Sequence, residues 1–238
     1  MSQNISDAAF PLTRWSILAR LDESDHGVKT ALEELCRVYR APLYSFARYQ
    51  GHSPSDAEDL VQGFLAKAAT NGLFRKADED RGKLRTFLLT AFRRFMRDEF
   101  EKATALKRGA GKTHSMDVAE LEEWYVDEDT ALKTPESAFD RRWAVSVLEN
   151  TILTLSERWR EKGKLDEFSL LRPFLTESGS ADDYAEVGKK SGTSSGTVKV
   201  RIHRLRATFA ALLREQVALT IESEEDVDDE LRYLIELI

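Results

Sequence analysis

Apolar residues recur at every third or fourth position through most of this chain, and this spacing is the strongest constraint on its fold. Leu, Ala, Glu, Lys and Arg dominate long segments, and only five Pro and twelve Gly interrupt the 238 residues. No strand-like alternation of apolar and polar residues competes with the helical spacing. With 42% hydrophobic residues the chain can bury a core. The sequence therefore predicts an all-α protein of one or two domains.

The cysteine and histidine content, the first ten residues and the length of the apolar stretches argue against several classes of protein. Cys36 is the only cysteine, so no internal disulfide can form, and the four histidines are too scattered for a zinc-binding spacing. The first ten residues lack the basic start and apolar run of a secretory signal. No apolar stretch approaches the ~20 residues of a transmembrane helix. We therefore expect a cytoplasmic protein without direct membrane insertion, a metal site or a small-molecule cofactor.

The sequence lacks two motifs that would indicate an enzyme. The run Gly109-Ala-Gly-Lys-Thr113 resembles a phosphate-binding loop only superficially, because Leu106 stands where that motif requires a glycine and no strand precedes it. No order of Ser, His and Asp typical of nucleophilic catalysis stands out either. We predict no catalytic residue, and hence a protein that is not an enzyme.

The helical segments group into two small domains joined by a linker. A helix or a broken pair of helices is expected over residues 28–50, a second helix begins at Ser53-Pro54, and a third runs from about Lys83 to Lys102. An acidic stretch without Lys or Arg then separates these helices from a second helical pattern. The predicted divisions are an N-terminal extension (1–27), a first domain (28–107), an acidic linker (108–134), a second domain (135–219) and an acidic tail with an amphipathic helix (220–238).

The second domain ends in the pattern of a helix-turn-helix. Gly192 can supply the left-handed residue that ends its first helix, and Ser194 or Ser195 can cap the second. Residues 189–214 contain seven Lys and Arg and no acidic residue, in a chain of net charge −7. Such a local basic excess favours a DNA-binding face over an ordinary helical hairpin with a solvated basic side. The residues predicted to face DNA are Ser195, Thr197, Lys199, Arg201 and Arg204.

A second basic segment covers residues 81–112, where ten Lys and Arg outnumber three acidic residues and alternate with phenylalanines. Positive charge follows a nucleic-acid backbone, and aromatic rings can stack on bases. Because Phe87, Phe92 and Phe95 lie on the apolar stripe of the predicted helix, we expect them to pack in the core instead. The arginines on the opposite face are the candidate contacts with nucleic acid.

Together these motifs resemble a bacterial RNA polymerase sigma factor of the sigma-70 family, extracytoplasmic-function (ECF) type. The resemblance covers nearly the whole chain. It depends on Asp56-Ala-Glu-Asp-Leu-Val-Gln62, on Arg81-Gly-Lys-Leu-Arg-Thr-Phe-Leu-Leu89, and on Tyr184-Ala-Glu-Val187 followed by Gly196-Thr-Val-Lys-Val-Arg-Ile-His-Arg-Leu-Arg206. Gly188 and Ser191 depart from the family pattern, which usually has Ala and Leu there, and residues 157–179 form a longer segment than usual.

The resemblance implies transcription initiation by core RNA polymerase directed to promoter DNA, and it admits an anti-sigma factor as a further partner. The alternative is a stand-alone helix-turn-helix regulator that binds duplex DNA without polymerase. The resemblance assigns contacts with the polymerase clamp to Asp56, Glu58, Asp59 and Gln62. It assigns contacts with the minus-ten promoter element to Arg93, Arg94, Arg97 and Lys102. It assigns contacts with the minus-thirty-five element to the stretch from Ser194 to Arg204.

Overall fold

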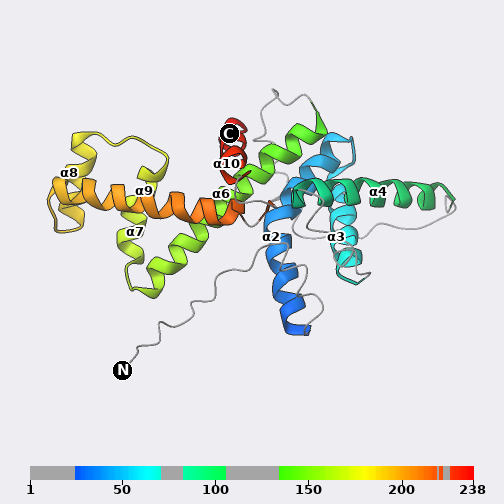
Figure 1. Ribbon diagram of the computed structural model, residues 1–238, viewed down its shortest axis with the longest axis horizontal. Coiled ribbons are helices and arrows are strands. Elements are labelled where there is room, and N and C mark those ends of the chain that lie inside the picture. The colour runs from blue at the N-terminus through cyan, green and yellow to red at the C-terminus, as the bar shows by residue number, and fades with distance from the viewer. Residues whose placement is uncertain (1–24, 71–82, 106–133, 219, 222–225) are drawn as a thin grey trace. The chain divides into compact units, whose positions relative to one another are not determined.

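The computed structural model describes residues 25–70, 83–105, 134–218, 220–221 and 226–238 (Figure 1). Within these residues every regular element is helical, which confirms the predicted all-α class. The chain divides into two compact units: Met1–Ser146 together with Val217–Ile238 form the first, and Val147–Gln216 form the second. Nearly all of the predicted N-terminal extension and acidic linker lies outside the described residues.

Three helices form the centre of the first unit: α2 (Asp25–Tyr49), α3 (Pro54–Thr70) and α4 (Leu84–Ala105). The sequence allowed one helix or two over residues 28–50, and the structure has the single helix α2 with Pro42 inside it. α3 begins as predicted, because Ser53 Oγ accepts a hydrogen bond from the backbone N–H of Asp56 at 3.2 Å. Pro54 takes the first helical position, where an N–H would have no helical partner.

Phenylalanine rings join these three helices. The ring of Phe92 on α4 lies 6.2 Å from Phe46 on α2 and 5.2 Å from Phe64 on α3, measured between centroids, and both pairs are edge-to-face. Such pairs stabilise a core beyond the area that they bury. Phe92 and Phe95 are buried, which confirms their predicted place in the core, whereas Phe87 is half-buried.

The helix α6 (Pro135–Glu161) contributes to both units, and here the structure differs from the predicted domain boundary at residue 135. Its first part, up to Ser146, belongs to the first unit, and the rest belongs to the second. Phe139 and Trp143 in the first part are fully buried. The apolar stripe of α6 continues across the division, so the sequence alone could not indicate which neighbours cover each part.

The second unit contains α7 (Leu165–Leu171), the 3-10 helix η3 (Arg172–Leu175), α8 (Ala181–Lys190) and nearly all of α9 (Ser195–Ala218), which runs past the end of the unit at Gln216 (Figure 1). One apolar core joins all of them to the end of α6. Its buried residues are Leu155, Phe168, Leu171, Phe174, Val187, Val198, Ile202, Leu205 and Leu212.

A short turn joins α8 to α9 where the sequence predicted a break. Gly192 has a φ of +64°, the left-handed conformation that glycine adopts without steric cost. Of the two candidate caps, Ser194 begins α9, since its Oγ accepts a hydrogen bond from the backbone N–H of Thr197 at 3.2 Å. At the other end of this pair, Ser180 and Asp183 form a capping box that starts α8.

Gly188 lets the turn close against α8. A Cβ atom added there would lie 2.8 Å from the carbonyl oxygen of Thr193, and the Thr193 N–H donates to the Gly188 carbonyl at 2.8 Å. The obstructing atom belongs to the backbone, so it cannot rotate away. This contact explains why a glycine stands where the resemblance leads one to expect alanine.

We expect Gly188→Ala to lower the free energy of unfolding of the second unit by about 2 kcal/mol, because the added methyl overpacks a fixed backbone. Gly196→Ala is the matched control. Gly196 is exposed in the first turn of α9, and a Cβ added there would make only an ordinary contact with Ser194 Oγ at 3.8 Å, so alanine should stabilise the helix by about 0.5 kcal/mol. Hydrogen exchange resolved by segment measures both effects in the second unit, and equal shifts would contradict this account of the turn.

The predicted tail helix, α10 (Val227–Glu236), belongs to the first unit. Just before α10, the carbonyl of Thr220 accepts a hydrogen bond from the backbone N–H of Leu84, the first residue of α4, at 3.2 Å. Val227 and Leu234 of α10 are buried. The tail therefore packs with a helix more than a hundred residues earlier in the chain.

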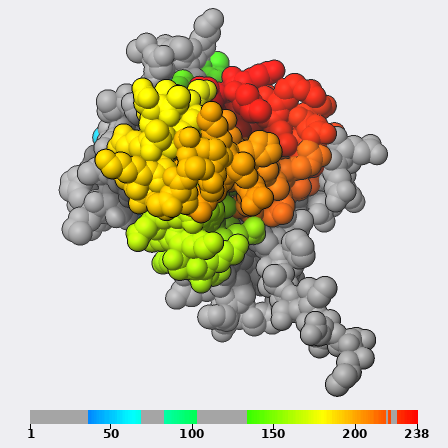
Figure 2. Space-filling view, turned by 90° about the vertical axis from the view of Figure 1, so that its left-hand side faces the viewer, coloured from blue at the N-terminus to red at the C-terminus, as the bar shows by residue number. Residues whose placement is uncertain are grey.

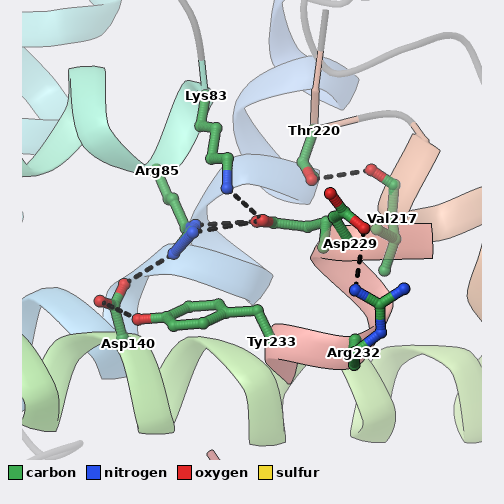
Figure 3. A network of polar contacts seen from close by, with 9 residues as sticks. Lys83, Arg85, Asp140, Val217, Thr220, Asp229, Arg232 and Tyr233 are labelled. Carbon is green, nitrogen blue, oxygen red and sulfur yellow. Dashed lines mark hydrogen bonds and ion pairs between the residues drawn. The ribbon is translucent and has the colours of Figure 1, made fainter. Parts of the chain in front are cut away.

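Buried charges fix this packing (Figure 3). Glu230 on α10 is 1% exposed and accepts hydrogen bonds from Lys83 Nζ at 2.5 Å and Arg85 Nε at 3.0 Å. The Arg85 guanidinium also donates to Asp140 on α6 at 3.0 Å. Its carbon atom lies 4.9 Å from the ring centroid of Trp143 and 4.7 Å from that of Tyr233. Arg85 thus connects α4, α6 and α10 through ion pairs and cation–π contacts.

Tyr233 completes the network by donating its hydroxyl proton to Asp140 at 2.8 Å. Burial raises the pKa of Tyr233 to about 12, and the hydrogen bond to Asp140 acts in the same direction. The phenol therefore remains protonated over the physiological pH range, as its role as a donor requires.

Candidate functional site

The acidic residues near the start of α3 have different environments. Asp56 is half-buried in the first turn and accepts a hydrogen bond from the Ser53 hydroxyl at 2.6 Å. Asp59, about one turn further along, and Gln62, nearly two turns along, are exposed. These three residues give the outer side of α3 a polar surface with negative charge, which the helix dipole favours near an N-terminus.

Glu58 lies inside the first unit, although the resemblance assigned it to a protein-binding face. Its side chain is 1% exposed and accepts hydrogen bonds from Arg40 on α2 at 2.7 Å and from Gln62 at 2.5 Å. A carboxylate in this position joins two helices and has almost no surface left for a partner. Glu58 therefore orients Arg40 and Gln62, and the structure does not place it with the exposed Asp59.

Three arginines lie on the outer side of α4, opposite the phenylalanine core. Arg93, Arg94 and Arg97 are exposed, and their spacing puts them on one side of the helix. Arg93 is the most constrained of the three: it forms an ion pair with Glu136 on α6, and its guanidinium lies 5.2 Å from the ring centroid of Phe46. Arg97 projects further, with 69% of its side chain exposed and only a 4.0 Å contact to Glu101.

Lys102 adds an exposed basic side chain near the C-terminal end of α4, seven residues after Phe95 and therefore in register with the apolar stripe. A hydrogen bond to Glu99 at 2.8 Å, together with the charge of that carboxylate, raises the pKa of Lys102 above its usual value. Lys102 thus remains a cation throughout the physiological pH range. The described part of α4 accordingly presents four basic side chains outside a rigid aromatic core.

The outer side of α9 carries most of the polar residues predicted to face DNA. Figure 2 views the side on which α8 (yellow) and α9 (orange) lie next to each other. Within α9, Lys199 Nζ lies 5.4 Å from the ring centroid of Tyr184 on α8. The residues of the predicted set that are exposed at the start and along the outer side of α9 are Ser194, Ser195, Thr197, Lys199 and Arg204.

Two arginines of α9 are held by the second unit itself. Arg201 is half-buried and forms an ion pair with Glu167 on α7 at 2.9 Å, so it lies on the flank of α9 instead of the outer side. Arg206 donates to the carbonyl oxygens of Phe174 at 2.7 Å and Glu177 at 2.8 Å. Sequence spacing indicated none of these three partners, because all of them lie in the segment before α8.

Two residues on the outer side of α9 were not singled out as facing DNA, although both lie in the stretch from Ser194 to Arg204 that the resemblance assigned to the minus-thirty-five element. Val200 and His203 are both exposed. The buried residues Val198, Ile202 and Leu205 define the inner side of the helix, and a helical projection from them would have placed Val200 and His203 opposite. The spacing of the buried residues thus indicates the outer position of both side chains, although neither is a charged or hydroxyl residue like those predicted to face DNA.

Other kinds of site are not found in the part of the chain that the structure describes. No group of three or more His, Cys, Asp or Glu side chains in it is arranged to hold a metal ion. None of its helices combines the length and the apolar character needed to cross a bilayer.

The comparison with known proteins points to the first unit. Residues 35–105, which contain most of α2 and all of α3 and α4, match the family model for sigma-70 region 2. No curated protein and no solved structure matches the chain. The matched residues include both the polar side of α3 and the basic side of α4. This chain is therefore similar to region 2 of the sigma-70 family, and the match supports a sigma factor of that family.

Proposed function

We propose that this protein is a cytoplasmic sigma factor of the extracytoplasmic-function type, which binds core RNA polymerase and directs it to promoters. The observation that carries the proposal is the region 2 match over residues 35–105. The exposed acidic side of α3 and the exposed basic side of α4 support it, because they suit two partners of opposite charge.

In this proposal α3 binds the polymerase clamp. Asp59 and Gln62 provide exposed polar side chains, and Asp56 contributes charge at the helix start. Glu58 is a positioning residue, because its buried carboxylate holds Gln62 and Arg40. Loss of the Glu58 charge would therefore act on polymerase binding through the arrangement of its neighbours.

The basic side of α4 binds the minus-ten element and holds its separated strand. Arg94, Arg97 and Lys102 are exposed side chains on a helix that the phenylalanine core holds in place. Cations fixed on a rigid element can neutralise phosphates along a strand and release counterions. Arg93 contributes less to DNA binding in this proposal, since the ion pair with Glu136 already neutralises its charge.

We further propose that α8 and α9 form a helix-turn-helix that reads the minus-thirty-five element. The short turn, the capped start of α9 and the outer side with Lys199 and Arg204 suit a recognition helix in the major groove. Arg201 supports this helix from its flank through Glu167.

Promoter-dependent transcription tests the proposal as a whole. Purified full-length protein added to core RNA polymerase should give transcripts that begin at promoters mapped after its overexpression, and core enzyme alone should give none from these sites. Binding to the same DNA with equal affinity in the presence and absence of core enzyme, without transcripts, would indicate the stand-alone regulator instead.

Asp59→Arg tests the polymerase-binding side of α3. We expect about tenfold weaker affinity for core polymerase, or about 1.4 kcal/mol, because the reversed charge would oppose a complementary partner. The fold should be preserved, since Asp59 is exposed near a helix start. Asp226→Arg, at the exposed start of α10 in the same unit, is a control with the same charge change. Equal affinities of the two variants for core polymerase would contradict the assignment.

A further inference from the structure

One large apolar side chain lies in the middle of the polar outer side of α9. Val200 is 50% exposed, whereas its nearest apolar neighbours in this helix, Val198 and Ile202, are 0% and 4% exposed. Lys199, His203 and Arg204 surround it on the helix surface and are exposed as well. Val200 thus forms a small apolar spot within a ring of hydrogen-bond donors.

The size of this spot limits what it can bind. A protein partner that docks through apolar contacts needs a continuous patch of several hundred square ångströms, and a single valine among cations does not provide one. The major groove of DNA fits better. Its base edges carry acceptors for the N–H groups of Lys and Arg, and thymine adds one apolar group, the C5 methyl, which aliphatic side chains contact.

The position of Val200 along α9 agrees with such a contact. α9 begins at Ser195, so Val200 is the sixth residue and lies in the second turn. The N-terminal residues of a recognition helix are those that reach base edges. Val200 is flanked by Lys199 on the same turn and by Arg204 one turn further, and either can bind a phosphate or a guanine beside the thymine.

We propose that Val200 contacts the C5 methyl group of a thymine in the upstream promoter element and makes α9 select an A·T pair at that position. This proposal rests on the proposed function, because it requires α9 to lie in the major groove. It adds a specificity-determining residue that acts through apolar contact, beside the polar residues of the same helix.

Replacement of single thymines by uracil tests the proposal, because uracil lacks only the C5 methyl group. Full-length protein with core polymerase is bound to a promoter mapped by its transcripts, with uracil placed at each thymine of the upstream element in turn. We expect one replacement to weaken wild-type binding about fourfold, the factor for one methyl-sized group buried from water. For Val200→Ser the same replacement should have no effect.

Two further measurements separate the possible failures. Arg204→Ala should weaken binding to the thymine and uracil templates equally. It should also lower the number of counterions released on binding, measured from the salt dependence of the affinity, by about one. If Arg204→Ala behaves in this way but no uracil replacement affects the wild type, or Val200→Ser keeps the wild-type response, the Val200 proposal is wrong while the proposed function stands. If Val200→Ser, Arg204→Ala and wild type all bind both templates alike, α9 does not read DNA, and the Val200 proposal fails together with the proposed helix-turn-helix role of α8 and α9.

Discussion

Replacing Val198 by Asp should unfold the second unit, whereas the same replacement at Val200 should leave it folded. Val198 is 0% exposed and belongs to the core that joins α8 and α9, with Val187 and Ile202 as neighbours in the same cluster. A carboxylate buried there without a partner costs at least about 4 kcal/mol. At the exposed Val200 the free energy of unfolding should change by less than about 0.5 kcal/mol.

Hydrogen exchange resolved by segment is the appropriate measurement, because a chain with two compact units need not unfold in one transition. Val198→Asp should remove protection from α7, α8 and the first part of α9, and Val200→Asp should keep it. α3 serves as the internal reference, since it lies in the other unit. Normal protection of α8 in Val198→Asp would contradict the core described for this unit.

Glu230→Ala should lower the free energy of unfolding of the first unit by about 3 kcal/mol. The substitution leaves Arg85, whose side chain is 9% exposed, without its main carboxylate partner, and removal of one member of a buried ion pair is strongly destabilising. Asp140 still accepts from Arg85, which keeps the loss near the lower end of the usual range. The lost ion pair with Lys83 contributes less to the destabilisation, because Lys83 is partly exposed and water can solvate its charge.

Glu236→Ala is the matched control, since it removes the same charge from an exposed position at the end of α10. Its effect should stay below about 0.5 kcal/mol. Segment-resolved exchange should show that Glu230→Ala exposes α10 and the first turn of α4, while Glu236→Ala leaves both protected. If the two variants lose equal protection, the buried network is not what holds the tail.

Local features of the fold were predictable to a large extent. Ser53 and Pro54 at the start of α3, and Gly192 with Ser194 between α8 and α9, act within a few residues of their own position. Caps and turns depend on the backbone next to them, so spacing along the chain is enough to recognise them. The apolar stripe of α4 was likewise visible, because a helix repeats in a regular way.

The candidate site was predicted only in part. Asp59, Arg97 and Lys199 are exposed, as a polar residue opposite an apolar stripe should be. Glu58 and Arg201 satisfy the same pattern, yet Arg40 and Glu167 bind them within the protein. The spacing of a charged residue gives its direction on a helix, but a partner on another helix decides whether it meets solvent.

The sequence by itself determined an all-α chain, the starts of its helices and the basic sides of two of them, because these depend on residues close together along the backbone. Only the tertiary structure decided that the tail closes on the first unit, through Glu230 and two cations nearly 150 residues earlier. A buried carboxylate requires a specific partner in space. The number of residues between the two in the sequence follows no helical repeat, so spacing along the chain cannot reveal the partner.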